Sequence, residues 1–396
     1  MDYDILISGG GIAGLTAAAA FGANGFKTLC VDPAPPVTDQ NAEGADLRTT
    51  AFLQPSQQLL ADIGLWDRLA PFAMPLQVMR IVDAGGELPE PRVVKEFDAG
   101  DISDQPFGWN LPNWLLRREI AAHLDNLPNV TFRPGTGTTT LFTRTAYAKV
   151  GLTDGSTVKT PLVVAADGRG SPMREAASIG AQVIRFGQKA LAFAVTHPIP
   201  HSNVSTEIHR TGGPFTFVPL PDHEGQPCSA IVWMEEGPKA EALLRLDPAA
   251  FEEAMTTRSC HLFGPLKLAS RRTLWPIIAQ HADRLSGERL ALIAEAAHVV
   301  PPIGAQGLNM SLRDLSTLLD LAIAQPDQLG SAAMLDAYHR KRMPDIRARV
   351  AGITVLNRTS MLSNPLLRDA RAKGLDALYA LKPVRKTLMQ LGLGAK

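Results

Sequence analysis

Short apolar runs separated by glycine dominate the beginning of the chain. The run at 4–8 is too short for a helix of the same polarity, so it predicts a buried strand. Residues 9–14 are rich in glycine, and the Ala-rich segment 15–23 predicts a helix that Gly25 ends. Residues 27–31 predict a second strand. The pattern is therefore strand, glycine loop, helix and strand within about thirty residues.

Two later regions have a different pattern, rich in β-branched and aromatic residues with Pro and Gly turns. They cover residues 74–100 and 179–283, and runs such as 191–195, 215–218 and 229–233 predict sheet strands there. From Ser311 onward the pattern is mainly helical, with breaks expected at four prolines: Pro326, Pro344, Pro365 and Pro383.

These patterns predict an α/β fold in which a β-sheet domain interrupts a Rossmann-type nucleotide-binding domain. The expected nucleotide-binding segments are 1–73, 101–178 and 284–330, and the expected sheet domain, which would hold the substrate, is 74–100 with 179–283. Residues 331–396 are expected to form a C-terminal helical region.

Composition narrows the class of protein. The 396 residues are 45% hydrophobic and 20% charged, as in ordinary globular proteins, and 39 basic residues balance 39 acidic ones. No chain-wide basic field for nucleic acid exists. The charge is uneven, however, because thirteen Lys and Arg face three Asp from Arg340 onward.

Three further features bear on the compartment and on metal binding. The three cysteines form no close pair, and the nine histidines show no metal-binding spacing, so no metal site is expected. Low cysteine use is typical of a reducing compartment, and the acidic N-terminus lacks the basic segment of a secretory signal. No apolar run reaches the roughly 18 residues of a membrane span. We expect a cytoplasmic protein.

The glycine-rich loop has the spacing of a dinucleotide-binding fingerprint. Gly9 would permit a tight turn, Gly11 would let the backbone approach a pyrophosphate, and Gly14 would let helix and strand pack closely. The free N–H groups at the helix start favour phosphates. Asp32, at the end of the second strand, could accept hydrogen bonds from an adenosine ribose; the alternative is a solvated acid at a strand end.

Two later strands also end in an acid. The apolar run at 162–166 precedes Asp167 and Gly168, which alone indicates only a strand and a turn. The run at 291–294 precedes Glu295. Residues 301–309 then place two prolines and two glycines before a helix, which suits a rigid loop that presents backbone N–H groups to an electron-rich ring edge or an anion.

Together these motifs resemble those of the single-component FAD-dependent aromatic hydroxylases of the p-hydroxybenzoate hydroxylase type, and most closely the ubiquinone-biosynthesis hydroxylases. The resemblance covers nearly the whole chain, with the motifs in order. It rests on the glycine loop, on Asp167-Gly168, and on the stretch from Ala294 to Asn309. Further similarity lies at 46–51, 213–215 and 231–233, and at Tyr338, Arg342 and Asp345.

The resemblance implies a role for each matching residue. Asp32 would bind the ribose, and Glu295 would bind the ribityl chain. Arg48 and Arg118 would contact the pyrophosphate–ribityl region, with Arg117 as the alternative to Arg118. Asp167 would lie on the phosphate side. Pro302 would lie beside the reactive flavin carbon. The implied cofactor-binding set is Gly9, Gly11, Ile12, Ala13, Gly14, Asp32, Arg48, Arg118, Asp167, Glu295, Pro302, Gly304, Gly307, Leu308 and Asn309.

The activity implied by the resemblance is a monooxygenase reaction. FAD is the cofactor, NAD(P)H the electron donor and O2 the co-substrate, and a flavin hydroperoxide hydroxylates the aromatic ring of a polyprenyl phenol in ubiquinone biosynthesis. Two alternatives stay open: a hydroxylase of a small soluble aromatic, and a non-catalytic flavin-fold subunit of a biosynthetic complex. The departure from the family pattern is Ala294-Glu295, where the family has Gly-Asp.

Residues at the reaction centre are less clear from the sequence. No catalytic base can be named, and His298 is interpreted as structural. Phe215, Phe217 and Trp233 could line a substrate pocket, although core packing is an equally good interpretation. Gln306 stands where the hydroxybenzoate type can have Lys, which favours the ubiquinone branch.

The basic C-terminal region also has two interpretations. A basic amphipathic surface could contact anionic lipid at the inner membrane face or a biosynthetic complex, which would suit a polyprenylated substrate. Alternatively, its helices pack on the core and expose a solvated charged face. The oligomeric state is not predicted.

Overall fold

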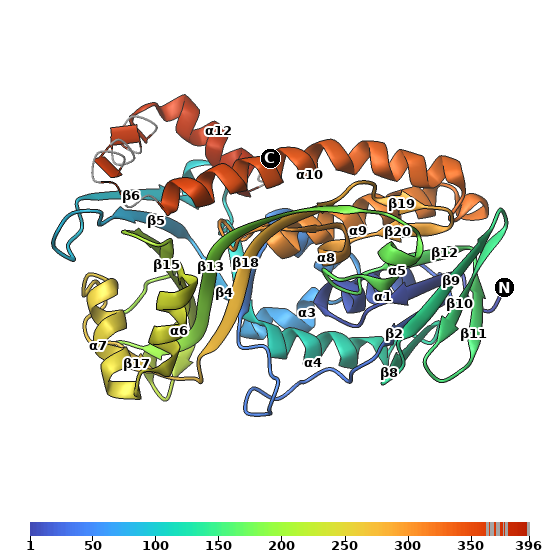
Figure 1. The fold of residues 1–396 in the computed structure, drawn as a ribbon, viewed down its shortest axis with the longest axis horizontal. Helices are drawn as coiled ribbons and strands as arrows, with labels where there is room; N and C mark the ends of the chain where they lie inside the picture. The colour runs from blue at the N-terminus through green and yellow to red at the C-terminus, as the bar shows by residue number, and fades with distance from the viewer. Residues whose placement is uncertain (362–363, 365–367, 370–372, 375, 377–378, 394–396) are drawn as a thin grey trace.

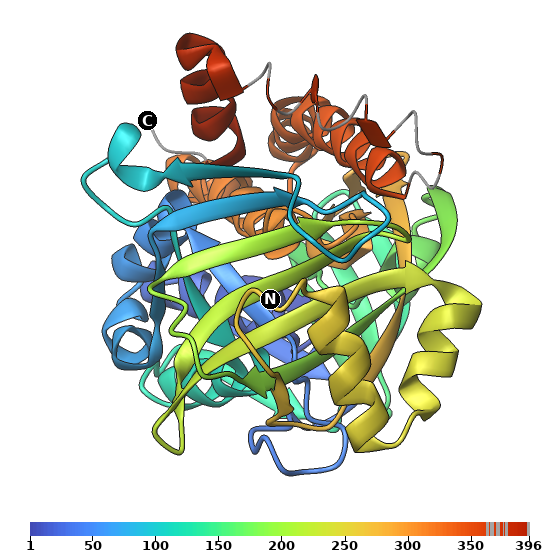
Figure 2. The same cartoon turned by 90° about the vertical axis from the view of Figure 1, so that its left-hand side faces the viewer.

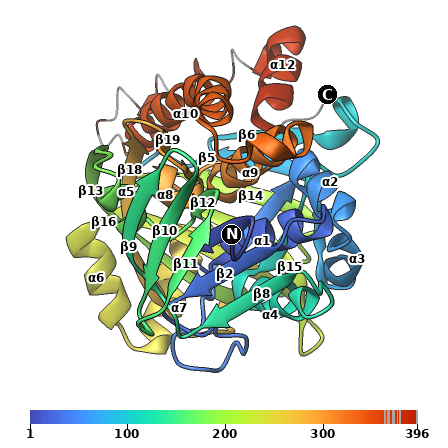
Figure 3. The same ribbon diagram turned by 90° about the vertical axis from the view of Figure 1, so that its right-hand side faces the viewer.

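The computed structural model describes residues 1–361, 364, 368–369, 373–374, 376 and 379–393. Its first element is a parallel sheet in the order β19-β20-β12-β1-β2-β8, in which only the β19–β20 pair is antiparallel (Figures 1 and 3). Its strands are β1 (Ile5–Ser8), β2 (Thr28–Asp32), β8 (Val130–Pro134), β12 (Leu162–Ala165), β19 (Ser286–Gly287) and β20 (Leu290–Leu292). These central strands are buried and apolar, as parallel strands covered on both faces should be.

Helices and a small antiparallel sheet cover this parallel sheet. Helix α1 (Ile12–Ala23) packs on β1 and β2 and against α4 (Asn113–Leu124) and α9 (Gln306–Ala324). The antiparallel sheet consists of β9 (Thr138–Arg144), β10 (Tyr147–Leu152) and β11 (Thr157–Thr160), with β10 packed on β12. The remaining short helices of this half are α2 (Gln54–Asp62), α3 (Trp66–Leu69), α5 (Pro172–Ala176) and α8 (Ala294–Ala297).

A nine-stranded sheet forms the second half of the molecule (Figure 2). Its strands are β5 (Val78–Asp83), β6 (Val93–Asp98), β13 (Ala181–Thr196), β14 (Val204–His209), β15 (Pro214–His223), β16 (Gln226–Glu236), β17 (Lys267–Leu268), β18 (Thr273–Ala282) and β21 (His298–Val299). Helices α6 (Gly237–Arg245) and α7 (Pro248–Arg258) pack on its outer face. The predicted α/β fold with an inserted β-sheet domain and C-terminal helices is confirmed.

The two halves are joined by long strands and by a small third sheet. Strands β13 and β18 pair along most of their length and arch from one half to the other (Figure 1). The third sheet has the order β3-β7-β4, with β3 (Thr49–Leu53), β4 (Met74–Leu76) and β7 (Gly108–Pro112). Residues 74–76, which we had assigned to the sheet domain, therefore pair with β7 instead of with β5.

The C-terminal helices differ from the predicted breaks. Helix α10 (Ala332–Ser360) continues through Pro344, so the expected break there is wrong. Pro344 is exposed, which lets water satisfy the carbonyl that loses its partner, while the neighbouring Met343 and Ile346 are buried and hold the helix in place. Pro326 does follow the end of α9, Pro383 lies in the first turn of α12 (Lys382–Leu393), and Pro365 lies outside the described residues.

Candidate active site

Four loops that carry predicted site residues meet at one edge of the parallel sheet. Strands β1, β2, β12 and β20 run parallel in adjacent positions, so the segments after them, which hold Gly9, Asp32, Asp167 and Glu295, lie at the same carboxyl edge. Ligands of open α/β sheets bind at this edge. Residues as far apart in the sequence as Gly9 and Glu295 are thereby brought to one crevice.

Two glycines of the first loop are required for steric reasons, and a third borders open space. Gly9 has φ +109°, and a Cβ there would lie 2.4 Å from the Ala166 carbonyl oxygen. A Cβ on Gly14 would lie 1.9 Å from the Gly9 carbonyl oxygen. Gly11 caps the N-terminus of α1 in extended conformation, and a Cβ there would meet nothing within 4 Å. The space beside Gly11 is open at a helix N-terminus, where phosphate groups bind well.

Asp32 fixes the conformation of this loop. One carboxylate oxygen accepts the Gly10 N–H at 2.6 Å, and the other accepts the Ala34 N–H at 2.8 Å. The half-buried carboxylate sits at the end of β2, beside the glycine loop, as expected for a ribose-binding acid.

A charged cluster around Arg48 connects the two halves of the molecule. The Arg48 guanidinium makes two hydrogen bonds, of 2.8 and 2.7 Å, to the buried Asp46 carboxylate, and it stacks over the Trp275 ring at 4.3 Å. The Asn113 side chain donates to Asp46 at 3.0 Å. Burial alone would raise the pKa of Asp46, but the hydrogen bonds and charge of Arg48 outweigh it and lower that pKa.

The charge of Glu295 acts on Arg48 in the folded chain. Burial alone would lower the pKa of Arg48, but the hydrogen bonds and charge of Asp46, together with the charge of Glu295, raise it. Glu295 is exposed in the first turn of α8, and the preceding Ala294 has φ +55°, in the left-handed region that favours glycine. The family's Gly is thus replaced by Ala at a position where the backbone still adopts the glycine conformation.

Asp167 faces the glycine loop from β12. Its Oδ2 accepts from the Met173 N–H at 3.1 Å and from the Ser8 hydroxyl at 3.3 Å, while its Oδ1 is buried without a partner among the described residues. Burial raises the pKa of this carboxyl group. The free oxygen is available to a bound ligand.

Helix α4 presents its two adjacent arginines in different directions. Arg118 pairs with Glu119 at 2.8 Å and lies over the rings of Phe72 and Trp114. Arg117 is one helical turn after Asn113, on the same helix face, and its buried Nε has no partner among the described residues. Asn113 contacts Asp46, so the Arg117 face is the one turned toward the Arg48 cluster.

The loop at 301–309 is held by the Asn309 side chain, which bonds backbone groups of β3 and of the loop itself. Asn309 accepts the Leu53 N–H at 2.9 Å and donates to the carbonyls of Ala51 and Ala305, so its amide fixes β3 against α9. Gly304 and Ala305 have φ +63° and +55°. Pro302, Gly304 and Gly307 are exposed, whereas Leu308 is half-buried. The Ile12 and Ala13 backbone at the start of α1 is also half-buried.

The aromatic residues predicted for substrate contact are in the core of the sheet domain. Phe215 and Phe217 are fully buried, Trp233 is 2% exposed, and Trp233 packs against Phe251 of α7. This placement matches the core-packing interpretation. Their neighbours alternate to the opposite face, where Val218 packs against an apolar cluster that Ala305 of the 301–309 loop also contacts; the cluster consists of Ala51, Leu53, Leu76, Ala99 and Phe107.

That opposite face carries small and only partly covered side chains. Ala194, Thr216, Val218 and Val232 are half-buried although they lie on central strands of the sheet. Trp275 is on the same face, since it pairs with Ala190 on β13, and it contacts Arg48. Strand alternation is the one signal for this face in the sequence, and using it requires the register to be known.

His298 belongs to a buried ionic network. Its Nε2 lies 2.6 Å from Asp314 Oδ2, Arg342 Nε donates to Asp314 Oδ1 at 2.8 Å, and Arg342 Nη1 donates to Asp345 Oδ2 at 2.8 Å. All of Asp314 and nearly all of His298 and Arg342 are buried. These contacts support the structural interpretation of His298.

The residues of the crevice fit FAD on the evidence of their geometry. The open space beside Gly11, the unpartnered Asp167 Oδ1 and the exposed Glu295 face one edge of the sheet. The exposed glycines of the 301–309 loop leave room for a planar ring. Among the described residues no group of three or more His, Cys, Asp or Glu side chains is placed to hold a metal ion.

Comparison with known proteins agrees with this geometry. Residues 2–352 match the FAD binding domain family. The ubiquinone hydroxylase UbiL of Rhodospirillum rubrum is 33% identical and covers 99% of this chain and 89% of its own length. The 3-demethoxyubiquinol 3-hydroxylase of Escherichia coli is 25% identical, with coverage of 99% and 98%.

Solved structures show the same fold. The p-nitrophenol 4-monooxygenase PnpA from Pseudomonas putida superposes with a TM-score of 0.79 at 18% identity, and the match covers 99% of this chain and 98% of that one. The family match over most of the chain and the full-length relatives lead to one conclusion. This chain belongs to the FAD-binding-domain family and, within it, to the ubiquinone hydroxylases.

Proposed function

We propose that this protein is an FAD- and NAD(P)H-dependent monooxygenase that hydroxylates the aromatic ring of a polyprenyl phenol in ubiquinone biosynthesis. The observation that carries the proposal is the full-length similarity to UbiL, whose name states ubiquinone hydroxylation. The partly exposed sheet face that carries Val218 supports it, because Val218 and Ala305 of the 301–309 loop pack against one apolar cluster, which brings this face near the loop.

We infer that the carboxyl-edge crevice holds the cofactor through specific residues. Asp32 would bind the ribose, the N–H groups from Gly11 to Ala13 the pyrophosphate, and Glu295 with Arg48 the ribityl chain. Arg117, with its buried unpartnered Nε, is better placed for this than Arg118, which is engaged with Glu119 and two rings. Residues Pro302 to Leu308 would lie along the flavin ring, positioned by Asn309.

The protein's own part in the reaction is placement and exclusion of water. FAD, when bound, would supply electron transfer from NAD(P)H and activation of O2. Thr216, Val218 and Val232 would form the wall of the ring pocket, since they share one sheet face, keep partial exposure, and include Val218, which packs against the same apolar cluster as Ala305. An apolar wall of small side chains excludes water while it leaves room for a substituted ring.

One experiment separates this activity from its alternatives. Purified protein is assayed for bound FAD, and NAD(P)H oxidation is followed with a prenylated phenol and with small soluble phenols. Substrate-stimulated oxidation with an oxygenated prenyl product supports the proposal. Stimulation by soluble phenols alone indicates the soluble-aromatic hydroxylase, and absence of both flavin and oxidation indicates a non-catalytic subunit.

Replacing Glu295 with alanine should lower the FAD content of the purified protein sharply. The reason is loss of a carboxylate that faces the crevice beside Arg48. Flavin absorbance per mole of protein measures the effect. Glu288→Ala is the control, because Glu288 lies on the antiparallel-sheet side, where it accepts a hydrogen bond from Thr143. Equal FAD content in both variants would contradict the ribityl-binding role.

We further propose peripheral association with an anionic membrane surface through α10. Arg340, Arg347 and Arg358 fall on one stripe of its outward face, and Val355, which is 62% exposed, lies beside that stripe. No helix in the described ranges is long and apolar enough to cross a bilayer. Basic and apolar side chains on one helix face suit contact with lipid headgroups.

Reversing the charge of Arg340, Arg347 and Arg358 to Glu should weaken binding to anionic vesicles at least tenfold. Each basic residue near a charged membrane contributes about 1 kcal/mol, so three reversals have a large effect. Vesicle sedimentation measures the binding. Reversal of three exposed residues on the antiparallel sheet (Arg144, Lys149 and Lys159) is the matched control. Equal binding by both triple variants would exclude α10 as the contact surface.

A further inference from the structure

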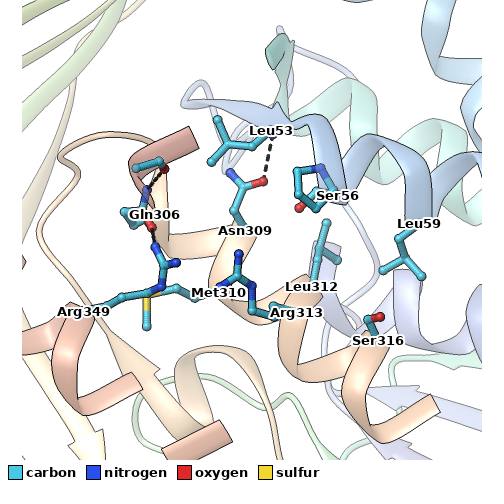
Figure 4. A pocket seen from close by; sticks show the side chains of 12 residues that line it. Leu53, Ser56, Leu59, Gln306, Asn309, Met310, Leu312, Arg313, Ser316 and Arg349 are labelled. Atoms are coloured by element: carbon cyan, nitrogen blue, oxygen red, sulfur yellow. Dashed lines mark hydrogen bonds between the residues drawn. The ribbon is translucent and has the colours of Figure 1, made fainter. Parts of the chain in front are cut away.

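A second cavity lies behind the 301–309 loop, between α2, α9, α10 and α12 (Figure 4). It encloses about 90 Å³, roughly three times the share of one liquid water molecule. Its polar side chains are those of Ser56, Gln306, Asn309, Arg313, Ser316 and Arg349. No acidic residue of the described chain lines it. Figure 4 shows Arg313 and Arg349 reaching into it from α9 and α10.

The cationic side chains here outnumber their carboxylate partners. Asp345 is the shared acid: Arg342 and Arg349 bind it at 2.8 and 2.9 Å, while Arg313 stands off at 3.6 Å. Asp314, the other acid, is occupied by Arg342 and His298. Three guanidinium groups thus meet two carboxylates, which leaves surplus positive charge beside the cavity.

The pKa of Arg313 reflects this surplus of positive charge. Burial and the positive charges of Arg349 and Arg342 lower the pKa of Arg313, and Asp345 only partly offsets them. A cation that is partly desolvated and crowded by like charges gains from an added anion. Arginine pairs bind tetrahedral oxyanions well, because each planar guanidinium can donate two parallel hydrogen bonds.

We propose that this cavity binds an oxyanion of the phosphate class between the guanidinium groups of Arg313 and Arg349. The hydroxyl groups of Ser56 and Ser316 are further donors on its walls. The same chemistry is offered by free phosphate and by the phosphate of an anionic lipid headgroup. Leu53, Leu59 and Leu312 in the lining are compatible with the carbon atoms of the second source.

The position of the cavity gives this site a connection to the active site. Arg349 Nη1 donates to Gln306 Oε1 at 2.6 Å, and Gln306 Nε2 donates to the carbonyls of Gly304 at 2.9 Å and Gly392 at 3.0 Å. An anion bound to Arg349 would be linked to the 301–309 loop through two hydrogen bonds, its own with Arg349 and the one that Arg349 donates to Gln306. The same glutamine joins that loop to α12.

The test is a calorimetric titration of the full-length protein with inorganic phosphate at constant ionic strength. The wild type should bind phosphate saturably, and Arg313→Gln should weaken binding at least tenfold, the effect of losing charged hydrogen bonds. Arg144→Gln is the matched control, since Arg144 is exposed on β9, away from the cavity, and the variant loses the same charge. Its affinity should stay within twofold of wild type.

A second variant and a second probe complete the test. Ser316→Leu fills the cavity without changing charge and should also abolish binding, which keeps the proposal falsifiable if Arg313→Gln fails to fold. The second probe is soluble dihexanoyl phosphatidic acid. If it binds at least tenfold more tightly than phosphate, the natural ligand is a lipid headgroup; if the two affinities are equal, the ligand is free phosphate. Absence of saturable binding of either probe, or equal loss in Arg313→Gln and Arg144→Gln, would overturn the proposal.

Discussion

Replacing Gly14 with alanine should destabilise the protein by about 3 kcal/mol and abolish FAD retention. A Cβ at this position would lie 1.9 Å from the Gly9 carbonyl oxygen. Both residues belong to backbone that is held in place between β1 and α1. Neither segment can move without displacing the buried core around Leu6 and Leu15. Urea unfolding followed by circular dichroism measures the stability, and flavin absorbance measures the retention.

Gly11→Ala is the matched control, because it adds the same methyl group in the same loop. A Cβ on Gly11 meets nothing within 4 Å and the backbone there is extended, so the fold should keep its stability to within about 0.5 kcal/mol. FAD content should nevertheless fall, since the added methyl group would occupy the space proposed for the pyrophosphate. Full FAD content in Gly11→Ala would contradict that placement, and a stable Gly14→Ala protein would contradict the steric argument.

Replacing Asp314 with alanine should cost about 3–5 kcal/mol of unfolding free energy. The carboxylate is fully buried and binds both His298 and Arg342, so its loss leaves a buried guanidinium with one fewer partner. Arg342 already has an unpartnered buried Nη2 among the described residues. The shift of the urea midpoint, measured at fixed FAD concentration, gives the size of the effect.

The control for Asp314 is an aspartate of the same region in an exposed ion pair. Asp336 contacts Arg284 at 3.3 Å, with 51% and 59% of the two side chains exposed. Asp336→Ala should change stability by less than about 1 kcal/mol. If Asp314→Ala were as mild as Asp336→Ala, the buried network would not be what holds α9 and α10 together.

Local chemistry explains why part of this site was predictable. Gly9, Gly14 and Asp32 act within one short unit, and their steric and hydrogen-bonding roles follow from spacing along the chain. Pro344 shows the limit of such reasoning. Its ring should break a helix locally, yet burial of Met343 and Ile346 keeps α10 continuous.

The direction in which each side chain points was the main feature that local sequence patterns did not predict. Phe215 and Phe217 are aromatic, as residues that line a pocket often are, but the strand register places their side chains against α6 and α7. Arg117 and Arg118 are adjacent, so only the orientation of α4 separates their environments. Asn113 and Trp275 carried no motif, and their contacts to Asp46 and Arg48 arise from distant segments.

By itself the sequence determined the order of strands and helices, the glycine loop and the acids at the strand ends, because these depend on neighbouring residues and on steric limits of the backbone. Only the tertiary structure decided which faces of the inserted sheet and of α4 meet the crevice, and that Arg313, Arg342 and Arg349 share one aspartate behind it. Those choices depend on how strands pair and helices pack across hundreds of residues, and such long-range contacts leave little trace in any single stretch of chain.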